Sequence, residues 1–259
     1  MSRSGTFFGG LIRDLFCATL LGLVVPHGAA AQDTSPDGLW EFTVAPYLLF
    51  PHMDGDVTIR GIPVEVDVGP GDIFERLDFG VMLYFEAANP DWAFTLDLLY
   101  MNLGETGQLP VSERVAEADM KQLALEVRGM RRLASWAEVG VGGRLNVLEG
   151  GLFVEEGEVL PGIDVSQTKT WFDPLIAARF IAPLTRWQLG VSGDIGGFGI
   201  GSDLAWQVYP FVGYRFSRLF ELAAAYRWLG MDYETGSGTD IFRYDMVTFG
   251  PEIGFLFHF

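Results

Sequence analysis

The residues of this sequence that can do chemistry are mostly acids and arginines, and they recur at every second position of apolar segments. Successive side chains of a β-strand point to opposite faces, so residues of one parity share a face. Charges gathered on a buried face must be paired or hydrated, because an isolated buried charge is costly. The charged residues of this predicted inward parity are Glu41, Glu86, Asp97, Glu126, Arg128, Glu138, Arg144, Asp173, Arg179, Asp194, Arg215, Glu221, Arg227, Glu252 and His258.

Opposite charges on neighbouring strands are expected to pair across this face. We interpret them as an ion-pair plug that fills a narrow barrel. The functional alternative is a narrow pore that prefers cations, because rings of acids favour cations. The predicted lumen pairs are Arg128 with Glu138, Arg215 with Glu221, Arg144 with Asp173, and Arg227 with Glu252.

Catalytic interpretations rest on His52 and His258. In "PHMDGD", His52 lies two residues before Asp54. This resembles the rim Asp–His pair of omptin-type outer-membrane proteases, but with the order reversed and without an assignable facing acid pair. A lipid-modifying hydrolase needs a serine in register with a histidine, and neither histidine has one. We expect no enzymatic activity; the alternative is a rim hydrolase, either omptin-like or lipid-modifying.

No cofactor or metal site can be named from ligand spacing. The single cysteine, Cys17, lies in the N-terminal apolar run, so Cys-ligated metals are not expected. The glycine-rich stretch at 193–203 precedes an alternating segment rather than a helix, which indicates a tight turn with positive φ and not a phosphate cradle. The acidic segments 51–76 and 148–170 are expected to be exposed, where their charge keeps the loops soluble. The alternative is that these loops bind divalent cations at the cell surface.

Residues 1–31 have the layout of a secretory signal peptide, in which basic residues precede an apolar run and three alanines end at Ala31. We expect cleavage near Ala31, a short periplasmic segment at 32–38, and a β-barrel at 39–259. A net charge of −17 argues against nucleic acid as a partner. Mean hydropathy is nevertheless +0.24, although no long apolar run follows the signal peptide.

Alternation of apolar and polar residues is the main structural signal. Trp40, Phe42 and Val44 share one parity, with Glu41 and Thr43 on the other. Ten such segments are each long enough for a tilted membrane crossing. They predict an all-β fold, a ten-stranded antiparallel transmembrane β-barrel, with eight or twelve strands as alternatives. The segments centre on 40–50, 78–87, 92–100, 123–127, 139–147, 172–180, 189–195, 206–216, 222–228 and 247–259.

Short and long connections alternate between these segments. Short turns near 87–91, 131–135, 182–186 and 217–220 are expected in the periplasm, and long loops near 51–76, 104–118, 148–170 and 232–244 outside the cell. The first long loop is predicted to hold a hairpin that turns at Arg60–Gly61 and extends the first two strands. Aromatic residues that begin the upward strands predict a periplasmic girdle at headgroup level: Trp40, Trp92, Trp136, Trp187 and Phe220.

The sequence ends on alternating apolar residues, Phe255, Phe257 and Phe259. This ending resembles the C-terminal signal that the barrel-assembly machinery reads in outer-membrane proteins. The pieces "WFDP", "GDIGGFGIGSDLAWQ", "AYRWLGMDY" and "GPEIGF" also resemble an uncharacterised family of small proteobacterial outer-membrane β-barrel proteins. The resemblance implies the outer membrane of a Gram-negative bacterium, with membrane lipid and the assembly machinery as partners. It implies no activity.

Overall fold

The computed structural model describes residues 39–59, 61–108, 115–154 and 163–259. The predicted signal peptide (1–31), its cleavage near Ala31, and the segment 32–38 lie outside these residues. The described helical elements are α2 (Pro70–Glu75) and the 3₁₀ turn η1 (Gly238–Asp240), and neither is long and apolar enough to cross a membrane. The strands are β1 (Glu41–Leu49), β2 (His52–Ile59), β3 (Ile62–Val68), β4 (Leu77–Ala88), β5 (Trp92–Gln108), β6 (Val115–Ala134), β7 (Ala137–Val154), β8 (Ile163–Leu184), β9 (Trp187–Gly197), β10 (Leu204–Arg215), β11 (Phe220–Thr235) and β12 (Phe242–His258).

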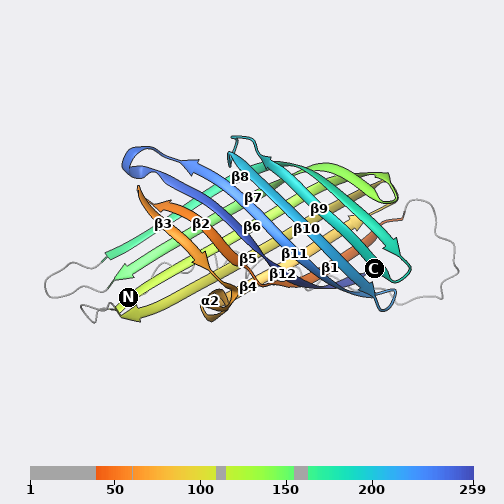
Figure 1. Cartoon of the computed structure of the whole chain (residues 1–259), viewed down its shortest axis with the longest axis horizontal. Coiled ribbons are helices and arrows are strands. Elements are labelled where there is room, and N and C mark those ends of the chain that lie inside the picture. The colour runs from red at the N-terminus through yellow and green to blue at the C-terminus, as the bar shows by residue number, and fades with distance from the viewer. Residues whose placement is uncertain (1–38, 60, 109–114, 155–162) are drawn as a thin grey trace. The chain divides into compact units, whose positions relative to one another are not determined.

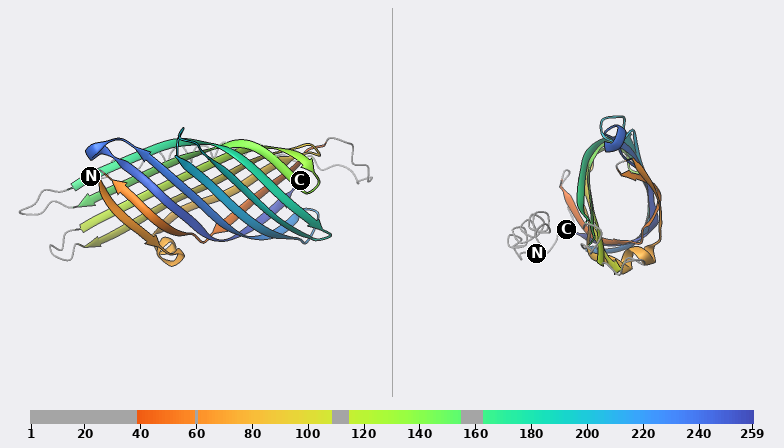
Figure 2. Two further views of the ribbon diagram at one scale, coloured as in Figure 1. Left: turned by 45° about the horizontal axis from the view of Figure 1, so that its top comes forward. Right: turned by 90° about the vertical axis from the view of Figure 1, so that its left-hand side faces the viewer.

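The barrel closes because β1 pairs with β4 on one side and with β12 on the other. The strands from β4 to β12 pair in chain order, so ten strands form a closed antiparallel ring. Figure 1 shows these strands side by side, and the end-on view of Figure 2 shows the ring. The predicted ten-stranded barrel is therefore confirmed. A count of twelve strands is reached only when the hairpin β2–β3, which pairs with β12 outside the closed ring, is included in the sheet.

The outer surface of the ring is apolar because of strict alternation along the strands. In β12, Ile253, Phe255 and Phe257 are 39–41% exposed, whereas the intervening Glu252 is 4% exposed and faces the interior. The same parity continues to Phe259, whose amide donates to the carbonyl oxygen of Phe42 at 2.9 Å. The alternation of apolar and polar residues along β12 thus produces both its apolar outer face and its polar inner face.

The two ends of the barrel differ in their connections. Four tight connections, at 89–91, 135–136, 185–186 and 216–219, lie at the end where β1 begins and β12 ends. We call this the turn end and the opposite end the loop end. The tight connections lie close to the predicted short turns.

The predicted long loops at 104–118, 148–170 and 232–244 are largely wrong, because the strands run much further toward the loop end. β11 continues to Thr235 and β12 begins at Phe242, and β5 and β7 likewise extend beyond the expected segments. Alternation persists there with mixed residue types: Tyr244 is buried, while its neighbour Arg243 is exposed. A hydrophobicity pattern alone does not detect such strands. Residues 109–114 and 155–162 lie outside the described residues.

The predicted hairpin around Arg60–Gly61 forms, with Ile59 opposite Ile62 and a positive φ of 78° at Gly61. Its placement differs from the prediction, because β2 pairs with the loop-end half of β12 and β3 does not pair with β4. The helix α2 connects β3 to β4. Where β1 ends, the amide of Leu49 donates to Met82 Sδ at 3.2 Å instead of continuing the ladder with β4.

The interior near the loop end is filled by an apolar core, contrary to the expectation of a polar inner face throughout. Inward-facing residues of the long strands meet there with the hairpin and with Ile73 of α2. This core separates the loop end from the charged interior. Its buried members are Tyr47, Leu49, Met53, Ile73, Leu99, Met101, Trp171, Ala205, Leu229, Met231, Phe242, Tyr244 and Met246.

Candidate functional site in the barrel interior

The first charged group, the Arg227 cluster, joins three strands directly beside the apolar core. The Arg227 guanidinium lies 2.8 Å from Asp97 Oδ2 and 2.9 Å from Glu252 Oε2. The hydroxyl of Tyr47 donates to Asp97 and that of Tyr209 donates to Glu252, each at 2.6 Å. The guanidinium carbon also lies 5.1 Å from the centre of each tyrosine ring, within cation–π range. The buried arginine is therefore held on several sides.

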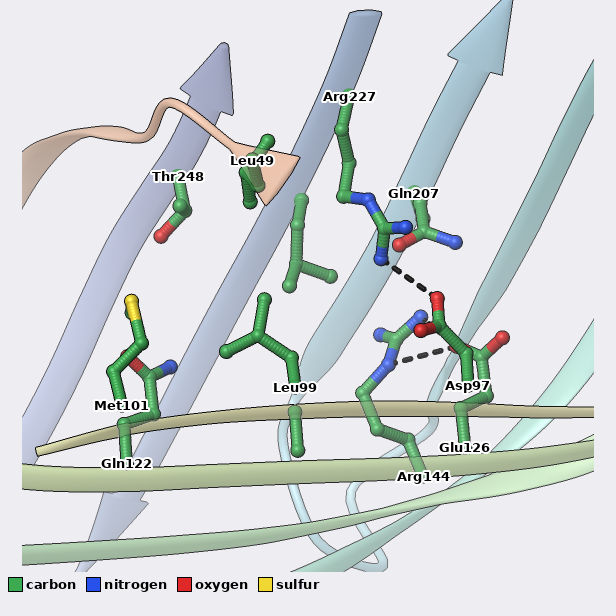
Figure 3. A pocket seen from close by; sticks show the side chains of 12 residues that line it. Leu49, Asp97, Leu99, Met101, Gln122, Glu126, Arg144, Gln207, Arg227 and Thr248 are labelled. Carbon is green, nitrogen blue, oxygen red and sulfur yellow. Dashed lines mark hydrogen bonds and ion pairs between the residues drawn. The ribbon is translucent and has the colours of Figure 1, made fainter. Parts of the chain in front are cut away.

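The second group, the Arg144 cluster, contains two arginines and two acids. Arg144 donates to Glu126 Oε2 through Nε at 2.9 Å and to Asp194 Oδ1 through Nη2 at 3.0 Å. Arg128 lies 2.7 Å from Asp194 Oδ2, contacts Glu126, and donates to Ser192 Oγ at 3.1 Å. Figure 3 shows Arg144 and Glu126 together beside Arg227 and Asp97. The two positive and two negative charges of this cluster therefore sum to zero.

The third group, the Arg179 cluster, lies nearer the turn end. Arg179 Nη1 is 2.5 Å from Glu86 Oε2, and its Nε donates to Glu138 Oε2 at 2.7 Å. Glu138 also accepts from Arg132 Nε at 3.1 Å. Tyr84 donates to Glu86 at 2.5 Å. One carboxylate, that of Glu138, thus bridges two arginines that come from β6 and β8.

At the turn end itself, a half-exposed arginine and a partly exposed histidine meet at one buried acid. Arg215 Nε lies 3.3 Å from Glu221 Oε2, and its side chain is half exposed. His258 Nε2 lies 3.3 Å from the same carboxylate oxygen, and its Nδ1 lies 3.0 Å from Thr43 Oγ1. These residues surround the mouth of the interior rather than a sealed site.

Two cavities lie on either side of the Arg227 and Arg144 clusters. The larger, of about 290 Å³, is lined by charged residues and reaches exposed Glu41 and half-exposed Arg215 at the turn end, so it is open there. The smaller, of about 20 Å³, lies between the clusters and the apolar core. Gln122 Oε1, Thr248 Oγ1 and Arg144 Nη1 are buried at its lining and have no hydrogen-bond partner among the described residues. A polar cavity of this size can hold one water molecule.

The predicted pair of Arg128 with Glu138 is wrong. The strand register places Arg128 opposite Gly142 and Glu138 opposite Arg132, with an irregularity between Arg132 and Ala134. Arg128 instead reaches Asp194, and Glu138 is held by Arg132 and Arg179. The turn was expected at 131–135, whereas β6 continues to Ala134 and the turn is at 135–136, so the β7 residue opposite Arg128 lies four positions further along the chain than Glu138.

The predicted pair of Arg144 with Asp173 is also wrong, although the two residues are opposite each other in the β7–β8 register. Asp173 is fully buried and has no arginine or lysine partner in the described part of the chain. It accepts from Asn146 Nδ2 at 2.9 Å and from the amide of Ser202 at 2.6 Å. Its function is therefore to anchor the β9–β10 turn, where Gly197 has a positive φ of 84°. The other two predicted pairs, Arg215 with Glu221 and Arg227 with Glu252, are in contact as described above.

Sequence reasoning missed the contacts that cross the lumen. Arg132 was assigned to a turn, and the bridges from Asp97 to Arg227 and from Glu86 to Arg179 join strands that are not neighbours. Parity indicated that most of these side chains face inward. Pairing across a closed ring, however, depends on its diameter and strand tilt, which no local pattern contains.

The predicted aromatic girdle lies on the outer surface near the turn end. Trp40, Trp92, Trp136 and Trp187 are exposed, and Phe220 is partly exposed. Trp136 lies within the β6–β7 turn rather than in a strand. The predicted assembly residues Phe255, Phe257 and Phe259 are exposed on the outer face of β12.

The rim candidate His52 faces away from the interior. It lies opposite Phe249 on β12, and the two rings stack with centres 4.9 Å apart. Its Nε2 is 2.8 Å from Asp67 Oδ1 on β3. The histidine and its carboxylate partner are therefore on the outside of the wall, remote from the charged lumen clusters.

The chain matches no protein-family model and no curated protein. Among solved structures, it is similar to the outer membrane protease OmpT from Escherichia coli, with 10% identity, 88% of this chain and 99% of that chain covered, and a TM-score of 0.49. It is also similar to Ail, the attachment invasion locus protein of Yersinia pestis, with 12% identity, 86% of this chain and 100% of that chain covered, and a TM-score of 0.39. A third similar structure is the toluene transporter TodX of P. putida, with 9% identity, 87% of this chain and 91% of that chain covered, and a TM-score of 0.36. The similarity is one of fold and assigns no activity to this chain.

Proposed function

We propose that this chain is an outer-membrane β-barrel protein with a closed interior and a mainly structural role, without a catalytic step. The closed ring satisfies backbone hydrogen bonds around its circumference, which a membrane requires. Its outward-facing residues are apolar, and exposed tryptophans such as Trp92 and Trp187 lie where the apolar surface meets the turn end. Aromatic side chains at this level are typical of membrane barrels.

The observation that carries the closed interior is that two different barriers lie in series along it. We call the Arg227 and Arg144 clusters together the charged plug. Along β11, Arg227 of this plug is followed two and four residues later by Leu229 and Met231 of the apolar core. The cavity at the turn end stops at the plug, and only a water-sized cavity separates the plug from the core. An ion that passed the charges would still have to cross a packed apolar layer.

The plug itself is expected to be rigid, because its arginines are held from several directions. Arg144 is 2% exposed and contacts acids from both β6 and β9, while Arg227 contacts acids from both β5 and β12. Releasing one such arginine would leave buried carboxylates without compensation. Spontaneous opening of this layer is therefore unfavourable.

Planar-bilayer recordings test this proposal. The purified protein is expected to give little or no steady current, and any residual current should prefer cations, because acids outnumber arginines around the larger cavity. Arg227→Ala should still give no stable channel, since the apolar core remains. Combining Arg227→Ala with Leu229→Ala and Met231→Ala weakens both barriers and is expected to raise the current.

A large and stable conductance from the unmodified protein would contradict the closed interior. A stable channel from Arg227→Ala alone would show that the charged plug is the sole barrier. Fractionation on sucrose gradients tests the location independently, and recovery of the folded protein outside the outer-membrane fraction would contradict it. The geometry gives no support for the alternative rim hydrolase, because His52 faces away from the interior.

A further inference from the structure

His52, Asp54 and Asp67 bring three metal-binding groups together on the outside of the β2–β3 hairpin. One imidazole nitrogen and one oxygen from each carboxylate all lie within 4.8 Å of one another. His52 and Asp54 lie two positions apart along β2, with one residue between them, so both point to the same face, and Asp54 is directly opposite Asp67 on β3. The strand register itself therefore assembles the group.

The local packing holds the group in place. The His52 ring stacks on Phe249 of β12 at 4.9 Å with an interplanar angle of 24°. Gly55, next to Asp54, has a φ of 151°, and a Cβ there would lie 2.2 Å from the backbone oxygen of Asp245. This close approach fixes the path of β2 against β12. The ligand group is thus built on paired strands rather than on a free loop.

The charges around the group favour a bound cation. Asp54 and Asp67 are opposite each other, and the next rung places Asp56 opposite Glu65. Like charges directly opposite on a sheet are destabilising. In the described ranges, neither Asp54 nor Asp67 has a lysine or arginine partner, and His52 is the one ion-pair partner of Asp67. A divalent cation would offset this repulsion.

We propose that His52, Asp54 and Asp67 form a binding site for a divalent transition-metal ion of the Zn²⁺ type. One imidazole and two carboxylates form a donor set that suits Zn²⁺, which binds nitrogen and oxygen at about 2.0–2.2 Å. Ca²⁺ and Mg²⁺ prefer oxygen ligands alone and would not use the imidazole. The site is exposed, so water completes the coordination.

Isothermal titration of the folded, detergent-solubilised protein with ZnCl₂ tests the site. The protein is expected to bind one Zn²⁺ in a saturable manner and more tightly than Ca²⁺ or Mg²⁺. His52→Gln and Asp67→Asn should each weaken Zn²⁺ binding by at least about 10-fold, since changes even to outer-shell partners of a metal have effects of this size. Zn²⁺ should also raise the unfolding temperature of the unmodified protein and not that of His52→Gln.

The matched control is Asp245→Asn, which removes a neighbouring exposed charge that is opposite Asp56 but outside the ligand group. It is expected to retain Zn²⁺ affinity. Three results would overturn the proposal: no saturable Zn²⁺ binding, undiminished Zn²⁺ binding by His52→Gln, or an equal loss of Zn²⁺ affinity in Asp245→Asn and in Asp67→Asn. The last result would mean that the acidic surface attracts cations without specific ligation. Circular dichroism and heat-modifiable gel migration verify that each variant is folded.

Discussion

At the residue scale, the stability of the plug depends on arginines that each satisfy two acids. Arg227→Met keeps most of the side-chain volume but leaves the Asp97 and Glu252 carboxylates without their cationic partner. We expect a loss of about 3–5 kcal/mol in the free energy of unfolding, measured by urea titration in lipid or detergent. Adding Asp97→Asn and Glu252→Gln to the same chain should recover part of it. A loss below about 1 kcal/mol, as at a surface pair, would contradict the assigned role.

Glu138 offers a second comparison at this scale. Its carboxylate is 2% exposed and bridges Arg132 and Arg179, whereas Glu41 is an exposed acid at the mouth of the same cavity. Glu138→Gln is expected to lower the unfolding free energy by about 3 kcal/mol or more. Glu41→Gln should change it by no more than about 0.5 kcal/mol. Similar effects of the two substitutions, measured by urea unfolding, would show that the bridge does not stabilise the barrel.

Which charged residues face inward could be predicted from parity, but most of their partners could not. Arg227 and Glu252 lie on adjacent strands, and their pairing was accessible from the sequence. Arg179 and Glu86 lie on β8 and β4, on opposite parts of the ring, so only closure brings them together. The mispaired Arg128 shows that a small error in the position of a turn moves every cross-strand partner, because the β6–β7 turn is at 135–136 and not at 131–135.

At the element scale, α2 completes the apolar core where β3 and β4 do not pair. Ile73 on this helix is 2% exposed, whereas its neighbour Phe74 is 39% exposed. Ile73→Ala is expected to cost about 2–5 kcal/mol by leaving a cavity. It should also increase proteolytic cleavage around residues 69–76. Phe74→Ala, which removes a more exposed side chain, is the control and should have a smaller effect on both measurements.

The last strand carries a prediction about assembly. The backbone of Phe259 makes two hydrogen bonds with Phe42, at 2.9 and 3.1 Å, and these help to join β12 to β1. We expect deletion of Phe259 to cause accumulation and degradation in the periplasm, measured by fractionation and immunoblotting. Phe259→Tyr, which keeps an aromatic ring and the backbone contacts, is the matched control. A normal outer-membrane yield of the deletion would contradict the assigned role of this end.

Strand number and closure could be predicted from alternation, but strand length and the loop-end interior could not. The extended parts of β11 and β12 mix tyrosine, methionine and acids, and those of β5 and β7 contain glycines and a glutamate, compositions that a hydrophobicity pattern assigns to loops. Met101, Met231 and Met246 are all buried in the apolar core because the barrel wall continues around them. The hairpin was located correctly, but its partner strand depends on the closure of the ring.

At the scale of the whole molecule, the interior is a cavity that opens at the turn end and is blocked by the apolar core toward the loop end. Side chains on its wall are therefore accessible from one compartment only. A membrane-impermeant arginine reagent added on the turn-end side of an oriented vesicle is expected to modify Arg215, whose side chain is half exposed. The same reagent on the other side would have to pass the packed methionines and aromatic rings and is expected to leave Arg215 unmodified. The interior of the barrel is thus accessible to solvent from the turn end and shielded from it by the apolar core toward the loop end.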